Sequence, residues 1–211
     1  PVRGGLAAAC LSGQVDLFGG ILAEFDIARI PRYSSKSSYA HFDHRASFAE
    51  VQAKILDSEY VSHHAFYPLI SNEIITVRYR GGKRSCKVRN FAYASHFDHR
   101  VFQYYSYLWS DLYNKKAIAE GFNEVAVAYR SSLSSDGAVT AGSNISSAKK
   151  AFDYMREQDS AFVLTGDFES FFDNLNHVHL MTSLRSLFPS GGLPDDHYLV
   201  IKNILRYSCW P

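Results

Sequence analysis

The sequence predicts an α+β fold with a basic β-hairpin, and three features of the chain indicate it. Two strand-like runs flank the pair Gly81-Gly82, and amphipathic helical patterns begin near residues 95 and 144. Residues 161–167 form a short apolar run of the kind found in buried strands. The 211 residues are 46% hydrophobic and 20% charged, which is the composition of a folded domain rather than a disordered chain. This length suits one ordinary domain or two small lobes that share a cleft.

The overall charge of the chain does not indicate a binding partner. Lys and Arg number 22 against 21 Asp and Glu, so the net charge is +1 and any basic surface must be local. The three cysteines, Cys10, Cys86 and Cys209, are far apart and lack the spacing of a zinc site, which favours a reducing, cytoplasmic location. No apolar run approaches the ~20 residues that span a bilayer, so we expect no membrane partner.

The N-terminal segment, residues 1–39, is predicted to be weakly structured, with a short helix around residues 17–27. The string His-Phe-Asp-His-Arg then occurs twice, at residues 41–45 and 96–100. We interpret this as coincidence, because a repeat architecture needs sustained periodicity over several units. Its histidines are accordingly expected to be polar surface or core residues rather than metal ligands.

Residues 74–92 carry the clearest local signal. The run 74–80 is rich in β-branched residues, Gly81-Gly82 follows as a two-residue turn, and residues 83–89 lead back, which is the pattern of a β-hairpin. No acidic residue occurs in residues 74–97. Six cations lie within twelve positions: Arg78, Arg80, Lys83, Arg84, Lys87 and Arg89. This cationic run has two open interpretations: it is a solvated surface, or it is the flexible tip of a hairpin that binds phosphates.

Two helices are predicted after the hairpin. The pair Ser95 and Asp98 has the spacing of a capping box. The helix that it opens carries one apolar face: Val101, Tyr104, Leu108 and Leu112. Its rings, including Tyr105 and Trp109, are expected to pack in the core rather than to stack on bases. Residues 122–129 are strand-like, residues 131–142 form a loop without pattern, and the second helix places Ile145, Ala148, Phe152 and Met155 on one face.

The run 161–167 ends on Asp167 and leads into a helix that contains Leu184 and Phe188. A carboxylate at the end of a buried strand is well placed to bind a divalent cation, and the following turn can add a backbone carbonyl. Alternatively, Asp167 caps a turn and Asp173 or Asn174 caps the helix. Spacing alone favours this capping interpretation.

Residues 167–177 resemble the first catalytic motif of reverse transcriptases of the group II intron, retron and defence type. That motif reads Asp, apolar, any, any, Phe, Phe, Asp, any, apolar, any, His. Upstream, residues 87–89 followed by 98–103 resemble the fingers motif of the family, with its basic pair and Asp-Arg-x-x-Gln helix start. Residues 122–148 resemble the next block, and residues 193–198 resemble the abortive-infection-like branch. The resemblance covers roughly residues 74–207, in the family's order.

The resemblance implies a right-hand polymerase, with a fingers lobe at 40–155 and the first part of a palm at 156–211. The implied activity is RNA-directed DNA polymerisation by two-metal nucleotidyl transfer with Mg²⁺ or Mn²⁺, in bacterial anti-phage defence. The implied partners are an RNA template, a DNA or protein primer and deoxynucleoside triphosphates, with a non-coding RNA as a further candidate.

The family's site roles transfer to individual residues of this chain. Asp167 would be a ligand to both metals, and the carbonyl of Phe168 would help to hold the nucleotide metal. Lys83 and Arg89 would hold the triphosphate, and the ring of Phe172 would crowd the sugar 2′ position. Three further cations would contact nucleic acid, with a structural role as the alternative for the last of them: Arg84, Lys87 and Arg100.

One departure is serious, because the family's second catalytic motif, Tyr-x-Asp-Asp, is absent. The pair Asp195-Asp196 follows a proline and leads into a helical pattern, so we interpret it as an N-cap. The chain begins at Pro1 and its first methionine is Met155. We therefore expect a piece of a longer protein, inactive by itself.

Two alternatives to an active polymerase stay open. The first is a catalytically inactive nucleic-acid-binding fragment or pseudo-polymerase. The second is a metal nuclease built around Asp167, Glu169 and Asp173, an interpretation that gives the pair Phe171-Phe172 no role.

Overall fold

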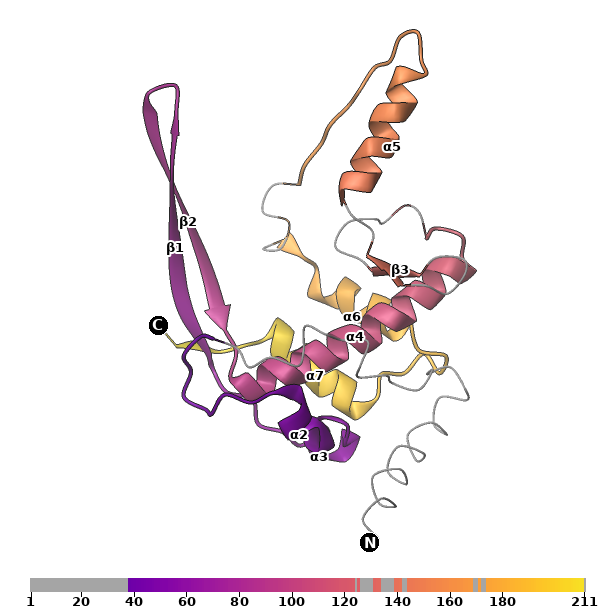
Figure 1. The fold of residues 1–211 in the computed structure, drawn as a ribbon. Helices are drawn as coiled ribbons and strands as arrows, with labels where there is room; N and C mark the ends of the chain where they lie inside the picture. The colour runs from indigo at the N-terminus through magenta and orange to yellow at the C-terminus, as the bar shows by residue number, and fades with distance from the viewer. Residues whose placement is uncertain are drawn as a thin grey trace, which may run out of the picture.

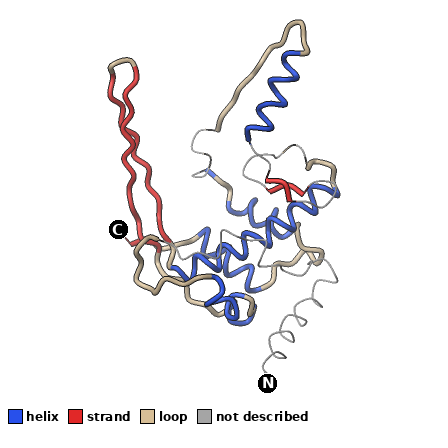
Figure 2. Tube along the Cα trace, in the orientation of Figure 1, coloured by secondary structure: helices blue, strands red, loops and turns tan. Residues whose placement is uncertain are grey.

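A computed structural model of the chain describes residues 38–123, 125, 131–133, 139–141, 144–168, 171 and 174–210. These residues form a mixed α and β structure, which confirms the predicted α+β class. A helical body surrounds one long central helix, α4, and two parts of the chain project from this body (Figure 1). One projection is a β-hairpin, and the other is the helix α5 with the segment that follows it (Figure 2).

The hairpin consists of β1 (Leu69–Arg80) and β2 (Lys83–Tyr93), in antiparallel register from Ile70 opposite Tyr93 to Arg80 opposite Lys83. The prediction of a hairpin is confirmed, and the strands are longer than the sequence pattern indicated. The φ angles of Gly81 and Gly82 are 57° and 74°, a left-handed pair that the tightest hairpin turn requires and that glycine adopts without strain. At the base, β5 (Cys209–Trp210) pairs in parallel with Leu69 and Ile70.

The long helix α4 (His96–Ala119) begins where the sequence predicted. The hydroxyl of Ser95 accepts a hydrogen bond from the Asp98 amide, at 3.1 Å. Only half of the predicted capping box forms, because the Asp98 carboxylate instead accepts hydrogen bonds from the Tyr67 amide and from His64 Nε2. All four predicted apolar residues of this helix are buried: Val101, Tyr104, Leu108 and Leu112. Before α4, the short helices α2 (Phe48–Ile55) and α3 (Ser58–Ser62) contribute Phe48, Ile55 and Val61 to the same core.

Two polar contacts, one buried and one partly buried, join α4 to α7 (Asp195–Leu205). The Tyr105 hydroxyl donates to Asp196 Oδ2 at 2.7 Å, and the Trp109 indole donates to His197 Nδ1 at 2.8 Å. Burial, and then the nearby Asp196 carboxylate, raises the pKa of Tyr105, so its hydroxyl remains a donor. Burial lowers the pKa of His197 against the opposing effect of Asp196, which keeps Nδ1 free to accept. Pro194 holds the N-cap position, so the interpretation of Asp195-Asp196 as an N-cap is wrong.

A second, smaller core joins α6 (His177–Arg185) to the middle of α4 and to α7. Its buried members are Leu112, Leu184, Phe188 and Ile201. Asn176 caps α6, because its side chain accepts from the His179 amide at 3.0 Å. The expected caps, Asp173 or Asn174, are therefore not the caps of this helix.

The predicted buried strand at 161–167 is wrong. These residues form no strand, and their side chains are exposed, up to 93% for Phe162. Among the described residues no strand pairs with them, and an apolar run without a neighbouring strand has neither backbone partners nor a sheet face to bury. Residues 131–142 differ as well, since they contain the short hairpin β3 (Ser131–Leu133) and β4 (Val139–Ala141).

The helix α5 (Asn144–Arg156) is confirmed, but its apolar face is largely exposed. The predicted helix at 17–27 and most of the predicted strand at 122–129 lie outside the described residues. In the part of the chain that the structure describes, no helix has both the length and the apolar character needed to cross a bilayer.

The substitution Tyr105→Phe should lower the free energy of unfolding by about 1–3 kcal/mol, because it leaves the buried Asp196 carboxylate without its hydroxyl donor. Urea denaturation measures this change. The matched control is Tyr79→Phe, whose ring is exposed on the hairpin, and it should stay within ~0.5 kcal/mol of the wild type. Equal effects of the two substitutions would contradict the importance of the α4–α7 contact.

Candidate nucleic-acid interface and predicted metal ligands

The register of the hairpin separates its side chains into two faces. Directly opposed residues share a face, and successive residues of a strand alternate between faces. One face, the basic face, carries five cations in four opposed pairs: Arg80 with Lys83, Arg78 with Ser85, Thr76 with Lys87, and Ile74 with Arg89. The other face, the apolar face, carries Tyr79 with Arg84, Val77 with Cys86, and Ile75 with Val88.

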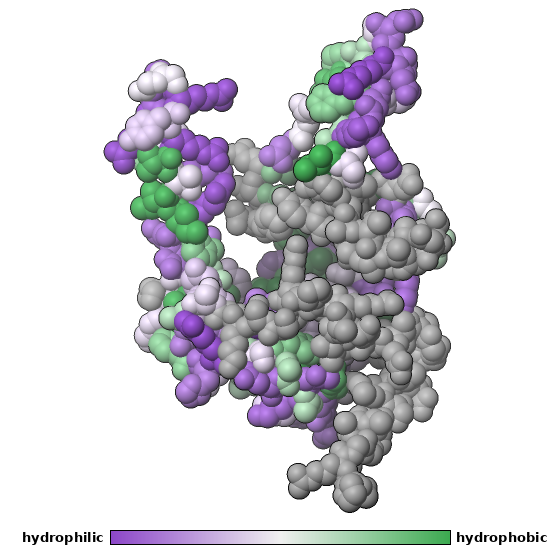
Figure 3. All heavy atoms as spheres, in the orientation of Figure 1, coloured by the Kyte–Doolittle hydropathy of each residue, from purple (hydrophilic) through white to green (hydrophobic). Residues whose placement is uncertain are grey.

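Both faces of the hairpin are exposed. All six cations are exposed, and so are Ile75, Val77, Tyr79 and Val88. Figure 3 shows the hairpin as a projection with a hydrophobic patch between hydrophilic residues. Two-stranded ribbons without a core on either face gain little from apolar burial, so the side chains are available to a ligand.

The described part of the chain does not neutralise the charges of the basic face. No carboxylate among the described residues forms an ion pair with any of the six hairpin cations. The only acidic residue of β1 is Glu73, which lies opposite Asn90 below the cationic region. Like charges at this density repel one another, and a polyanion such as a nucleic-acid backbone relieves that repulsion.

The structure brings together three of the predicted site residues and separates a fourth. Lys83, Lys87 and Arg89 share the basic face, whereas Arg84 lies on the apolar face beside Tyr79. The predicted site omitted Arg78 and Arg80, which complete the basic face. A signal for them exists in the sequence, because a two-residue turn fixes the register and therefore the face of every residue.

Arg100 is not placed to contact nucleic acid. Its side chain is 1% exposed, its Nε donates to the Ala46 carbonyl at 3.1 Å, and its Nη1 donates to Gln103 Oε1 at 2.8 Å. The guanidinium thus ties residues 38–47 to α4. The structural role that was the alternative for Arg100 is the one that its surroundings support.

Asp167 and Phe168 lie on the exposed segment between α5 and α6. The Phe168 amide donates to Asp167 Oδ1 at 2.9 Å, a contact between neighbouring residues, and residues 161–168 form no turn for Asp167 to cap. The Phe168 ring is 81% exposed and lies 6.0 Å from the ring of Phe171. Asp167 therefore lacks the rigid support that a strand end would provide.

The described residues do not fit a two-cation site. No three His, Cys, Asp or Glu side chains within the described ranges are placed to share a metal ion. Asp167 offers one carboxylate, and two divalent ions about 3.5–4 Å apart need several. The predicted nucleotide contact Phe172 and the nuclease residues Glu169 and Asp173 lie outside the described residues.

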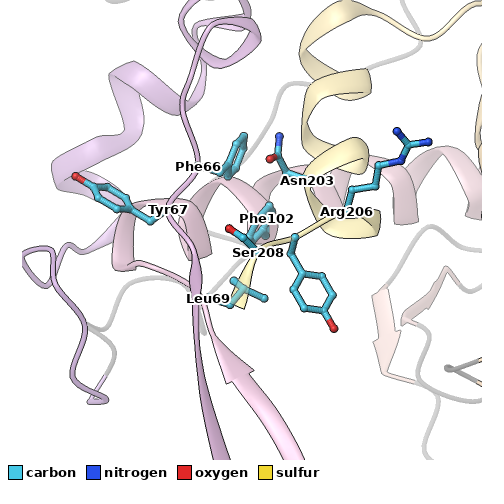
Figure 4. Close-up of a pocket in the computed structure, with 8 residues that line it drawn as sticks. Phe66, Tyr67, Leu69, Phe102, Asn203, Arg206 and Ser208 are labelled. Carbon is cyan, nitrogen blue, oxygen red and sulfur yellow. The ribbon is translucent and has the colours of Figure 1, made fainter. Parts of the chain in front are cut away.

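A cavity of about 160 Å³ lies at the base of the hairpin (Figure 4). It is lined by Phe66, Tyr67, Leu69, Phe102, Asn203, Arg206, Tyr207 and Ser208. The rings of Phe66 and Phe102 stack at 5.2 Å, and Arg206 points away from them in Figure 4. None of the described site residues lines this cavity, so it is separate from the basic face.

Comparison with known proteins does not assign the chain to a family. No protein-family model matches the chain, and a search of curated proteins finds no match.

Changing Lys83, Lys87 and Arg89 together to Ala should weaken binding of single-stranded RNA and flatten its salt dependence. The slope of log K against log salt should decrease by about 2, because each neutralised phosphate on a single strand contributes about 0.7. Fluorescence anisotropy over a salt series measures the slope. The charge-matched control replaces Lys149, Lys150 and Arg156 of α5 with Ala and should leave the slope nearly unchanged. An equal change in both triple variants would contradict a specific role of the basic face.

Proposed function

We propose that the chain is the fingers lobe and the first part of the palm of an RNA-directed DNA polymerase, a reverse transcriptase of the defence-associated kind. The observation that carries the proposal is the exposed basic face of the hairpin, with its cations gathered around a glycine turn. In this function the hairpin cations hold the triphosphate of the incoming deoxynucleotide and the backbone of the RNA template. The primer is DNA or protein, a non-coding RNA is a further candidate partner, and the protein acts in the cytoplasm.

The anchoring of the hairpin supports this proposal. The fingers-like motif places Asp98, Arg100 and Gln103 in the first turns of α4, directly after β2. Asp98 binds the loop before β1 through the Tyr67 amide, and Arg100 binds both Gln103 and the Ala46 carbonyl. Asp98 therefore holds the start of the hairpin against the helix, and Arg100 holds residues 38–47 against it, while the cationic tip stays exposed.

A catalytically inactive nucleic-acid-binding protein is the second candidate, and the surroundings of Asp167 favour it. Asp167 lies on an exposed segment and belongs to no described group of three or more side chains that could hold an ion. Binding by the basic face requires no such site, so it is compatible with either candidate. Under the polymerase proposal, two Mg²⁺ or Mn²⁺ ions are required, and further carboxylates must complete the ligand set.

We expect the protein encoded by the complete reading frame to extend a primer on an RNA template with deoxynucleotides and Mg²⁺ or Mn²⁺. Asp167→Ala should reduce extension to background and shift the free energy of unfolding by less than about 0.5 kcal/mol, because the exposed carboxylate makes only a local contact. Asp159→Ala, at an exposed aspartate nearby, is the control and should extend normally. The 211-residue chain alone should give no extension.

Primer extension also separates the two candidates. Complete loss on Asp167→Ala supports the polymerase. Absence of extension by the whole protein, together with retained RNA binding, supports the inactive binding protein. An Asp167→Ala protein that still extends primers contradicts the role of Asp167 as a metal ligand.

Phe172→Ala should preserve turnover with deoxynucleotides and admit ribonucleotides, because removal of the ring opens space for the 2′-hydroxyl. We expect the ratio of kcat/KM for the two sugars to fall by about 10–100-fold, the discrimination that a steric contact of this size supplies. Single-nucleotide extension measures the ratio. Phe162→Ala is the matched control, since that ring is 93% exposed, and the ratio should not change. Unaltered sugar selectivity in Phe172→Ala would remove Phe172 from the nucleotide site.

A further inference from the structure

The two copies of the His-Phe-Asp-His-Arg string lie against each other in the fold. The ring of Tyr39, before the first copy, stacks on the ring of Tyr93, before the second, at 4.8 Å. The same ring stacks on His96 at 4.7 Å, and its hydroxyl donates to the Ala94 carbonyl at 3.0 Å. Two strings far apart in sequence therefore build one junction, where residues 38–47, the end of β2 and the start of α4 meet.

Asp43 stabilises this junction through two hydrogen bonds. Its Oδ1 accepts from the His96 amide and its Oδ2 from the Phe97 amide, each at 3.0 Å. These amides belong to the first turn of α4, where backbone donors lack intrahelical partners. The carboxylate of the first copy thus caps the helix that carries the second copy, and residues 38–47 dock by means of this cap.

Two imidazoles are enclosed beside Asp43. The His96 residue is 1% exposed, the His41 side chain is 0% exposed, and their ring centroids lie 6.5 Å apart. Among the described residues, neither ring nitrogen of His41 has a hydrogen-bond partner, nor does His96 Nδ1. Imidazole nitrogens that lack a protein partner are places where a proton can bind.

The groups that face these imidazoles come from every element packed around them. Residues 38–47 contribute Tyr39, Asp43 and Arg45, α4 contributes His99 and Arg100, β2 contributes Tyr93, and the loop before β1 contributes Tyr67. Burial lowers the pKa of His96 below 6.5; Asp43 opposes this shift, and His41, Arg45 and Arg100 add to it. Burial lowers the pKa of His99 as well, together with Arg100 and His96.

These shifts fix the direction of the pH effect. In the docked state, residues 38–47 lie against α4 and the base of the hairpin; in a released state they would be detached from both. A histidine whose pKa is depressed in the docked state binds a proton more readily in the released state. The docked state therefore has its full stability above the ordinary histidine value of 6.5, and it loses stability as the pH falls below 6.5 towards the folded pKa.

We propose that the paired copies form a proton-sensitive clasp, which releases residues 38–47 from the base of the hairpin and from α4 under mildly acidic conditions. A proton on His96 places a third positive charge beside Arg45 and Arg100. Since Tyr39 supports Tyr93, release also loosens the base of the hairpin. This clasp does not depend on the polymerase proposal.

The test is a ¹H–¹⁵N NMR titration of the whole chain from about pH 7.5 to about pH 5, the range in which histidine titrates. The amides of His96 and Phe97 report on the clasp, because Asp43 accepts from both. The Trp109 indole N–H reports on the core, because it donates to His197. We expect the two amides to lose their hydrogen-bonded shifts below about pH 6.5 while the indole resonance keeps its position. A simultaneous change of all three signals would mean global unfolding and would overturn the proposal.

Substitutions assign the effect to particular histidines. His96→Phe keeps a ring on Tyr39 but binds no proton, so it should abolish the transition of the Phe97 amide. His44→Phe is the matched control, because His44 belongs to the first copy of the string but is exposed, and the Phe97 amide should titrate in this variant as in the wild type. His96→Gln provides the second test and decides the result if His96→Phe does not fold; its side chain binds no proton either, so it should also abolish the transition. A transition that persists unchanged in the folded histidine variants of the clasp would overturn the proposal.

Discussion

Hydrogen bonds made by α4 hold the described part of this molecule together, because buried polar groups need partners and several of them find those partners on this helix. At its start, Asp43 caps the backbone of α4 and Arg100 reaches the Ala46 carbonyl. At its centre, Tyr105 and Trp109 bind the first turn of α7. Near its end, Lys116 donates to the Ser186 hydroxyl after α6 at 2.9 Å. Through these bonds a single helix fixes the placement of segments that are distant in sequence.

Local signals were sufficient to predict the elements whose cause is local. The glycine pair determined the hairpin, Ser95 determined the start of α4, and apolar periodicity determined α5, α6 and α7. The parallel pairing of β5 with β1 was not predicted, because it joins residues about 140 positions apart and leaves no local pattern. The run 161–167 was misjudged because an apolar segment becomes a strand only where a neighbouring strand is present, and composition does not reveal that neighbour.

In the candidate site, too, some features could be predicted from the sequence and others could not. The basic face follows from alternation and a fixed register, so its five cations could be assigned from sequence alone. The direction of an individual charged side chain could not. Arg100 and Asp196 belong to charged motifs, yet both point inward because the packing of α4 offers each a buried partner. A set of metal ligands is even harder to predict from sequence, since its members converge only through tertiary structure.

The open edge of the hairpin has a further consequence for the behaviour of the protein at high concentration. In the described sheet, with strand order β2-β1-β5, the outer edge of β2 is unpaired, and the adjacent surface exposes Ile75, Val77 and Val88. An exposed edge with apolar neighbours is a template for aggregation between chains. Here Lys83, Lys87 and Arg89 lie along that edge, and a second copy would bring its own cations against them. Mutual repulsion therefore opposes growth of a sheet from chain to chain, and high salt or a bound polyanion would remove that protection.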